Sequence, residues 1–180
     1  MLEKSMQKLN LAKRRMWSTL RRRRTWAERI ATEAWRKTAL FEPFGGSCTV
    51  TRIAAEEFGW TCTQPMDKEF GDQYDLLKPE AERQLFEALE QQDPYLTVIA
   101  FPCWMFSVMA NMNKGIDWES LRKTVGRKLL RLVKKICLHR MQRGRYFLVE
   151  NPATACSWTF EEILTELMEK DEVYMGFGDQ

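Results

Sequence analysis

The pattern between residues 95 and 150 constrains the fold most. It consists of an apolar run with almost no charge, a long amphipathic stretch and a second apolar run. Residues 95–101 include almost no polar side chain, which predicts a strand buried on both faces of a sheet. Residues 118–141 repeat apolar side chains every three or four positions with Lys and Arg between them, which predicts an amphipathic helix. Residues 145–150 are predicted to form the next strand. Two strands joined through a helix indicate a parallel pair with a crossover connection.

The same alternation extends over the rest of the chain from residue 39. We expect further strands at 39–44 and 60–63, the start of another at 173–177, and further helices at 50–58, 80–91 and 160–168. The predicted fold class is therefore α/β: a Rossmann-like, mostly parallel sheet with flanking helices, preceded by a basic N-terminal helix. A chain of 180 residues has room for one such domain, assigned to 39–180, and for an extension at 1–38.

The extension combines a helical apolar spacing with a run of four arginines. Trp26, Ile30 and Ala34 lie four residues apart, as on one face of a helix. The run consists of Arg21, Arg22, Arg23 and Arg24. It is read either as a solvated helix face or as a contact to a polyanion, such as a phosphate backbone or a nuclear-import receptor, and the two readings carry similar weight.

Charge is segregated along the chain, although the total is only +3. Residues 1–38 sum to +9 and 118–145 to +9, whereas 39–117 sum to −8 and 146–180 to −7. We expect the basic blocks to bind a polyanion and the acidic blocks to contain the residues of the candidate site. The single histidine, His139, is expected to be solvated on the basic face of the long helix.

Several classes of protein are not expected. No apolar run approaches the ~20 residues of a membrane-spanning helix, and the first residues lack a signal-peptide core, so no membrane partner is expected. Five cysteines without a CxxC pair indicate reduced thiols and an intracellular protein, with the nucleus favoured over the cytoplasm. One histidine makes a zinc site or His-based catalysis unexpected, and no metal is predicted.

Parallel sheets bind ligands at the carboxyl ends of their strands, so the residues at those ends are the candidates for function. The first strand runs from Glu42 into a Gly45-Gly46 turn, which by itself indicates only a tight connection. The second ends near Asp67, whose carboxylate has the chemistry to accept hydrogen bonds from ribose hydroxyls, and Asp75 follows. Most aspartates at such places merely cap helices or turns, and that alternative stays open.

The residues that end the strands at 95–101 and 145–150 indicate a chemical function more specifically. The first runs directly into Pro102-Cys103, which places a thiol at the mouth of the sheet. The second ends in Glu150-Asn151. Burial of a carboxylate after an apolar strand costs free energy unless the group forms an ion pair or has a functional role. A buried structural cysteine is the plain alternative, but Cys103 and Glu150 together predict a nucleophile and an acid on adjacent strand ends.

In order along the chain, EPFGGS, PMD, DLL, FPCWMFS and VENP resemble the sequential motifs of the cytosine-C5 DNA methyltransferases. The resemblance covers roughly residues 39–152, and FPCWMFS is its most specific part. The abbreviated motifs are similar in particular to methyltransferase-like segments inside retrotransposon-type polyproteins of dinoflagellates, which are mobile elements.

This resemblance implies S-adenosylmethionine as the cofactor and a nucleic acid as the partner, with DNA favoured over RNA. Cys103 would attack C6 of a flipped-out cytosine as a thiolate, and Glu150 would assist at N3. Pro102, Ser107 and Asn151 would belong to the substrate loop, with Asn151 holding the Pro102–Cys103 segment. The implied cofactor-binding residues are Glu42, Phe44 and Gly46 at the methionine end, Asp67 at the ribose, and Asp75 with Leu76 at the adenine.

The chain also departs from the family pattern. Cys48 stands where a second glycine is usual, Trp104 replaces glutamine and Pro152 replaces valine. The later Arg-x-Arg motif and the target-recognition domain do not occur before Gln180, so we expect either a domain truncated at its C-terminus or a minimal domain to which a partner protein supplies target recognition. Two alternatives stay open: a catalytically inactive nucleic-acid-binding module on the same fold, and an α/β domain that binds a small nucleoside and assembles through its N-terminal helix.

Overall fold

The computed structural model describes residues 38–113 and 115–178. The predicted basic extension at 1–38, with its four arginines 21–24, lies outside the described residues except for Thr38.

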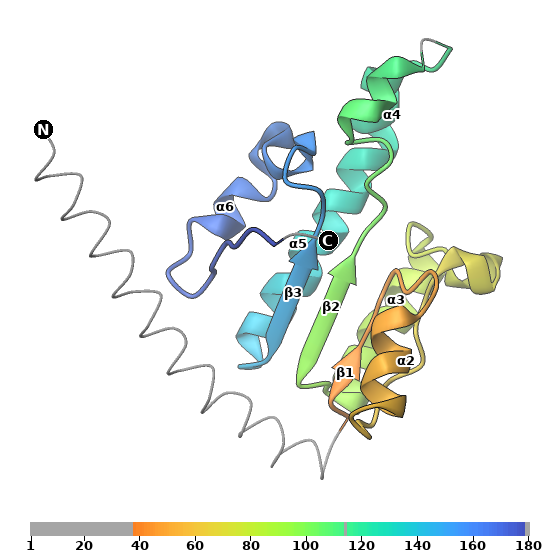
Figure 1. The fold of residues 1–180 in the computed structure, drawn as a ribbon, viewed down its shortest axis with the longest axis vertical. Coiled ribbons are helices and arrows are strands. Elements are labelled where there is room, and N and C mark those ends of the chain that lie inside the picture. Colours follow the sequence, from red (N-terminus) through yellow and green to blue (C-terminus); the bar gives the residue numbers. More distant parts are fainter. Residues whose placement is uncertain (1–37, 114, 179–180) are drawn as a thin grey trace, which may run out of the picture.

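Three parallel strands form the sheet (Figure 1). They are β1 (Leu40–Phe41), β2 (Leu96–Ala100) and β3 (Tyr146–Glu150), in the order β1-β2-β3. The five residues of β2 pair one by one with the five of β3, from Leu96 opposite Tyr146 to Ala100 opposite Glu150. The predicted parallel sheet is confirmed, and all three strands direct their carboxyl ends to the same edge.

A fourth segment runs along the other side of β1 without becoming a full strand. Leu40 pairs with Cys62 and Pro43 pairs with Met66 as isolated parallel bridges. The strand predicted at 60–63 is therefore reduced to single bridges. The chain leaves β1 toward this segment on one side and then returns to place β2 on the opposite side.

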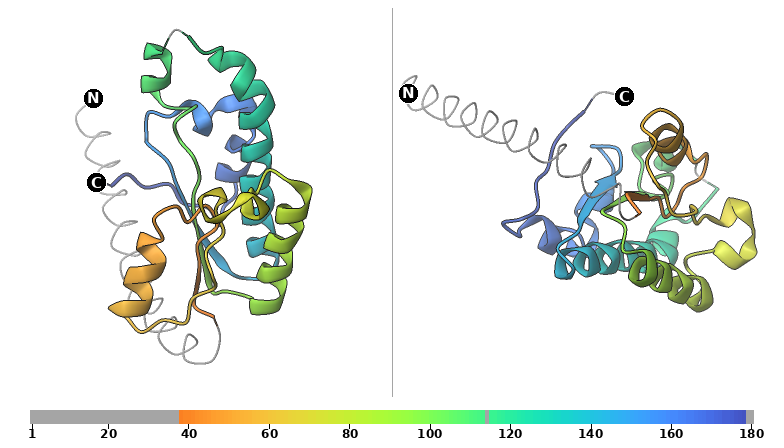
Figure 2. Two further views of the ribbon diagram at one scale, coloured as in Figure 1. Left: turned by 90° about the vertical axis from the view of Figure 1, so that its right-hand side faces the viewer. Right: turned by 90° about the horizontal axis from the view of Figure 1, so that it is seen from below.

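Helices cover both faces of the sheet (Figure 2). Helix α2 (Thr49–Glu56) packs on one face, where Leu40 and Val98 form a small core with Ala54. Helices α3 (Pro79–Gln92) and α5 (Arg127–Gln142) pack on the other face, where Phe41 and Ile99 join the larger core. Alternate residues of β1 and β2 thus point to opposite helical layers, as expected for strands buried on both faces.

The long helix predicted at 118–141 is confirmed, with a local irregularity. It comprises α4 (Trp118–Leu121), a π-helical turn at Arg122–Gly126 and α5. Gly126 lies where a Cβ would come within 3.0 Å of the Phe106 ring and 3.3 Å of Met105 Sδ. The absence of a side chain at this position lets the helix approach the segment that follows β2.

The carboxy-terminal part differs from the prediction. The helix expected at 160–168 is divided into a short 3-10 turn, Phe160–Glu162, and α6 (Thr165–Met168), and another 3-10 turn, Cys156–Trp158, precedes it. The strand expected to begin at 173–177 is wrong: this segment is irregular, and Tyr174 and Phe177 are exposed. Strand-forming side chains do not produce a strand where no neighbouring strand pairs with them. Further 3-10 turns lie at Lys68–Phe70, Asp72–Tyr74 and Val108–Met112.

Charges that are segregated in the sequence are paired in the fold. The cations of α5 meet acids from α3 and from the carboxy-terminal part: Lys135 pairs with Glu82 and Lys134 with Glu166. The expectation that His139 is solvated is wrong, because its side chain is 16% exposed and its Nε2 lies 2.6 Å from Glu90 Oε1. Much of the basic face of the long helix is thereby neutralised.

A buried ionic cluster ties α3, α5 and β3 together. Asp93 accepts hydrogen bonds from Arg140 and Arg145, and Arg143 lies 3.4 Å from the same carboxylate. The Arg140 side chain has no exposed surface and also donates to the carbonyls of Leu89 and Pro94. The hydrogen bond from Arg145 holds the pKa of Asp93 well below its usual range.

No helix among the described residues is both long and apolar enough to cross a lipid bilayer.

Candidate functional site

The carboxyl edge of the sheet brings three loops to one side of the molecule (Figure 1). They are the turn after β1, which contains Gly45 and Gly46, the Cys103 loop (residues 101–107) after β2, and the segment beginning with Asn151 after β3. Because the strands are parallel and adjacent, loops far apart in sequence leave the same edge.

The Cys103 loop is held on both sides of its cysteine by the segment that follows β3. Asn151 Nδ2 donates to the Phe101 carbonyl at 3.0 Å, two residues before Cys103. The backbone N–H of Cys156 donates to the Phe106 carbonyl at 2.9 Å, three residues after it. Ser157, which has no exposed surface, donates from Oγ to Asn151 Oδ1 at 3.0 Å and so fixes the orientation of the amide.

The helix that follows the loop supports it from the other side. Arg122 Nε donates to the Met105 carbonyl at 2.7 Å. Within the loop, the Cys103 carbonyl accepts from the N–H groups of Phe106 and Ser107, both at 2.9 Å. Ser107 Oγ caps the next turn by accepting from Met109 N at 3.1 Å. The loop is thus a hydrogen-bonded turn, and Pro102 and Cys103 within it are half-buried.

Glu150 is the last residue of β3 and pairs with Ala100, three positions before Cys103. Its side chain is half-buried. The predicted nucleophile and the predicted acid therefore leave neighbouring strands at the same edge. A thiol and a carboxyl in this arrangement have the chemistry for covalent attack assisted by a proton donor.

The turn after β1 has an unusual backbone. Phe44, Gly46 and Cys48 have φ values of 64°, 41° and 53°, in the left-handed region that is rare for residues with a side chain. A Cβ on Gly45 would lie 2.7 Å from Pro65 Cβ, whereas one on Gly46 would meet nothing within 4 Å. The turn therefore packs tightly against the second strand segment at Gly45 and faces open space at Gly46.

Two carboxylates hold this turn. Asp67 Oδ2 accepts from Gly46 N at 3.1 Å, and Asp67 Oδ1 accepts from Glu69 N at 2.9 Å. Glu42 is 4% exposed, and its Oε2 accepts from both the N–H and the hydroxyl of Thr51, at 2.9 and 2.7 Å. Partial burial, together with the charges of Glu42 and Asp67, raises the pKa of the Cys48 thiol. Both carboxylates therefore lie beside the turn and accept hydrogen bonds from it or from the start of α2.

The remaining predicted cofactor residues have structural roles. Asp75 Oδ1 accepts from Leu77 N at 3.1 Å and closes a turn. Leu76 is 3% exposed and packs in the larger core. The structure therefore brings Glu42, Gly46 and Asp67 together but keeps the Leu76 side chain away from the surface.

Ser157, Arg122 and Gly126 support the Cys103 loop and were not identified from the sequence. Each acts on the loop from more than 15 residues away, and no short motif marks them. The indole of Trp158 adds a further contact by donating to the Pro152 carbonyl at 2.9 Å.

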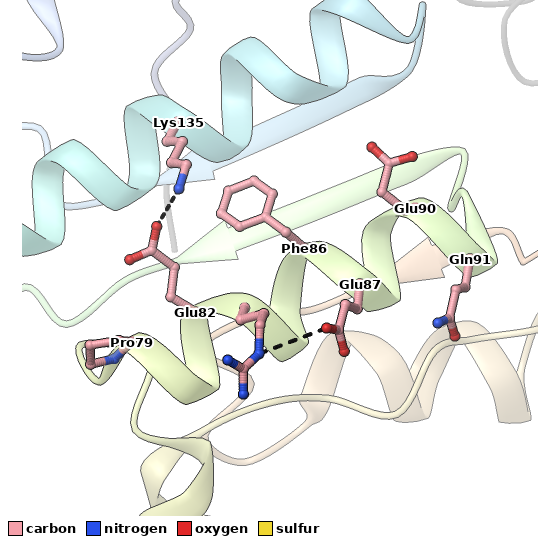
Figure 3. Close-up of a pocket in the computed structure, with 8 residues that line it drawn as sticks. Pro79, Glu82, Phe86, Glu87, Glu90, Gln91 and Lys135 are labelled. Atoms are coloured by element: carbon pink, nitrogen blue, oxygen red, sulfur yellow. Dashed lines mark hydrogen bonds and ion pairs between the residues drawn. The ribbon is translucent and has the colours of Figure 1, made fainter.

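A hollow of about 530 Å³ lies elsewhere, along α3 with Lys135 of α5 (Figure 3). Phe86 lies at its centre, and Lys135 Nζ is 4.5 Å from the centroid of that ring. Glu82 pairs with Lys135 and Glu87 with Arg83, so these carboxylates are already neutralised. Because none of the strand-end residues lines it, this hollow is not the candidate site. The described residues contain no group of three His, Cys, Asp or Glu side chains placed to hold a metal ion.

Comparison of the chain with protein-family models, with curated proteins and with solved structures gave no match.

Proposed function

We propose that the domain beginning at residue 39 is an S-adenosylmethionine-dependent DNA cytosine-C5 methyltransferase-like domain. The observation that supports this most is the edge formed by β2 and β3. Cys103 and Glu150 leave adjacent parallel strands there, and Asn151 binds the loop that carries the cysteine. This placement at neighbouring strand ends is what the motifs FPCWMFS and VENP imply.

The topology supports a Rossmann-like version of the fold. Residues 60–66, β1, β2 and β3 lie side by side in that order, and the direction in which strands are added reverses at β1. In open parallel sheets, ligands bind beyond the carboxyl ends of the strands at such a reversal. The turn around Gly46 follows β1 at that point.

The residues of the turn suit a cationic methyl donor. Gly46 leaves room for close approach, and Glu42 and Asp67 supply negative charge beside it. S-adenosylmethionine, when bound, supplies an electrophilic methyl group on a positively charged sulfur. In the proposed site the acidic turn binds the methionine end and orients it toward the Cys103 loop.

Cys103 and Glu150 would activate the cytosine. The Cys103 thiolate forms a bond to C6, and the displaced ring electron pair moves toward C5, with charge developing at N3. The Glu150 carboxyl donates a hydrogen bond or a proton to N3 and stabilises that charge. After C5 has accepted the methyl group, its proton leaves to a solvent base, the C5–C6 double bond reforms and the Cys103 thiolate is expelled.

Calorimetric titration with S-adenosylmethionine tests the cofactor half of the proposal. We expect the wild-type chain to bind and Gly46→Val to bind at least about tenfold more weakly, because the new side chain occupies the open space and strains the turn. Gly59→Val is the matched control, since Gly59 also has a positive φ and open surroundings but lies at the end of α2. Absence of binding by the wild-type chain would overturn the proposal.

A non-catalytic nucleic-acid-binding module is the second candidate, and the Cys103 loop favours it. Trp104, which replaces the glutamine of the family motif, is 47% exposed and packs edge-on against Trp118 at 5.9 Å. Exposed aromatic rings offer stacking platforms for unpaired bases. Single-stranded DNA or RNA binding that needs no cofactor and is unchanged by Cys103→Ala would favour this candidate.

A further inference from the structure

Exposed apolar side chains gather between the Cys103 loop and the start of α4. Trp104 is 47% exposed, and Val108, Met109 and Met112 on the 3-10 turn that follows are each more than half exposed. Met109 and Met112 lie three positions apart, which places them on the same side of a 3-10 helix. A concentration of large apolar side chains at the surface marks an interaction site, whereas scattered ones are ordinary.

The Trp104 ring is held in place by a second indole. It packs edge-on against Trp118, with the ring centroids 5.9 Å apart. Trp118 is itself fixed, because its Nε1 donates to the Asn113 carbonyl at 2.8 Å. The helix that Trp118 begins is capped by Asp117, whose Oδ1 accepts from Ser120 N at 3.0 Å. A ring held in this way loses little conformational freedom when another flat ring stacks on its exposed surface.

Basic side chains in the first turns of the long helix are engaged in ion pairs. Lys123 Nζ lies 2.6 Å from Glu119 Oε1, and Arg127 donates to both carboxylate oxygens of Glu161. Affinity for duplex DNA depends on cations that neutralise its phosphates. This surface therefore suits contact with the faces of bases better than contact with phosphates.

We propose that Trp104, with the exposed apolar side chains of the Val108–Met112 turn, binds the unpaired bases of a single-stranded nucleic acid. Base faces are free to stack on aromatic side chains in a single strand but are hidden within the stack of a duplex. Trp104 directly follows Cys103, so a base stacked on its ring would lie beside the thiol. That this base is the one attacked by Cys103 rests on the proposed function, whereas the binding does not.

The opposite use of such a ring is as a wedge in a duplex. An apolar side chain inserted between stacked base pairs kinks and partly unstacks the DNA, and proteins that work in this way bind double-stranded DNA. A single-stranded partner instead spares the domain the cost of extruding a base from a duplex. The two uses predict opposite strand preferences, so a measured preference decides between them.

Fluorescence anisotropy with the full chain, without cofactor, tests the strand preference. The probes are a labelled DNA strand of about 20 nucleotides, the RNA strand of the same sequence and the DNA duplex. At about 0.2 M salt, where phosphate contacts are weakened, we expect a single strand to bind at least about fivefold more tightly than the duplex. Phosphate contacts from any other part of the chain favour the duplex, because its charge density is higher.

Variants at Trp104 locate the contact. Trp104→Ala should weaken single-strand binding about 5- to 150-fold and leave duplex binding unchanged, whereas Trp104→Phe retains a ring and should keep most of the affinity. Phe58→Ala is the matched control, since Phe58 is 65% exposed and packs against Trp60 with centroids 6.1 Å apart, but lies beyond the end of α2. It should leave both affinities unchanged. Far-UV circular dichroism checks that each variant folds.

Trp104-dependent binding of either single strand supports the proposal, and the tighter of the two identifies the polymer. Duplex binding as tight as single-strand binding, or a Trp104→Ala variant that binds single strands as the wild-type chain does, would overturn it. A strand preference without S-adenosylmethionine binding would refute only the enzymatic proposal and leave this surface intact. S-adenosylmethionine binding without a strand preference would do the reverse.

Discussion

Replacement of Asn151 by alanine tests the link between the two strand-end loops. The Asn151 amide donates to the Phe101 carbonyl and accepts from the Ser157 hydroxyl, both at 3.0 Å, and it is 8% exposed. Alanine removes both hydrogen bonds and leaves a carbonyl and a fully buried hydroxyl without these partners. Each orphaned buried group costs about 1–3 kcal/mol, so we expect the free energy of unfolding to fall by about 2–6 kcal/mol.

Urea denaturation followed by circular dichroism measures this change. Asn113→Ala is the matched control: its side chain accepts a hydrogen bond from Gly115 N but is exposed, so we expect a loss below about 0.5 kcal/mol. In a double-mutant cycle, Ser157→Ala should cost little once Asn151 is alanine, because its hydroxyl has already lost its acceptor. An Asn151→Ala variant no less stable than Asn113→Ala would refute the idea that this amide secures the Cys103 loop.

Three further perturbations have defined outcomes. Asp93→Asn leaves the buried Arg140 without its counter-ion and should destabilise the fold by about 3–5 kcal/mol in urea denaturation. The pKa of Asp93 is lowered in the folded state, so the contribution of this carboxylate to stability is complete above about pH 4 and is lost as the pH falls further. In an acid titration, the wild-type chain should therefore lose more stability below about pH 4 than the Asp93→Asn variant does. Gly126→Val should cost about 1–3 kcal/mol through overlap with Phe106, and thermal denaturation would detect it. Deletion of residues 1–24 should spare folding and weaken nucleic-acid binding at low salt; an unfolded product would mean that the arginine-rich segment is structural.

The periodicity of the sequence predicted those helices and strands whose own apolar pattern determines which side is buried. The strands at 95–101 and 145–150 became β2 and β3, and the helix at 80–91 became α3, because dense apolar runs and amphipathic stretches leave few alternatives. The strand at 173–177 failed because a strand needs a neighbour, and composition does not supply one. The net charge of each sequence block was a poor guide for a similar reason, because charges from different blocks pair in the fold. Lys135 and Glu82, for example, lie 53 positions apart but form an ion pair.

The residues of the candidate site also fall into those that the sequence predicted and those that it did not. Strand-end motifs predicted that Cys103 and Glu150 would leave neighbouring strands, since consecutive strands joined through a helix usually lie side by side in a parallel sheet. Ser157 and Arg122 were not predicted because contacts between loops depend on the path of the chain. The main-chain N–H of Cys156, which binds the Phe106 carbonyl, has no sequence signal at all, since any residue other than proline provides it.

Covalent trapping on DNA that contains 5-fluorocytosine tests the central claim most directly. Fluorine at C5 cannot leave as a proton does, so elimination is blocked and the protein stays bonded to C6. With S-adenosylmethionine present, we expect the wild-type chain and Cys62→Ala to form a complex that survives denaturing electrophoresis, and Cys103→Ala to form none. A wild-type chain that binds S-adenosylmethionine but gives no adduct, or an adduct that persists in Cys103→Ala, would contradict the assignment of Cys103 as the nucleophile.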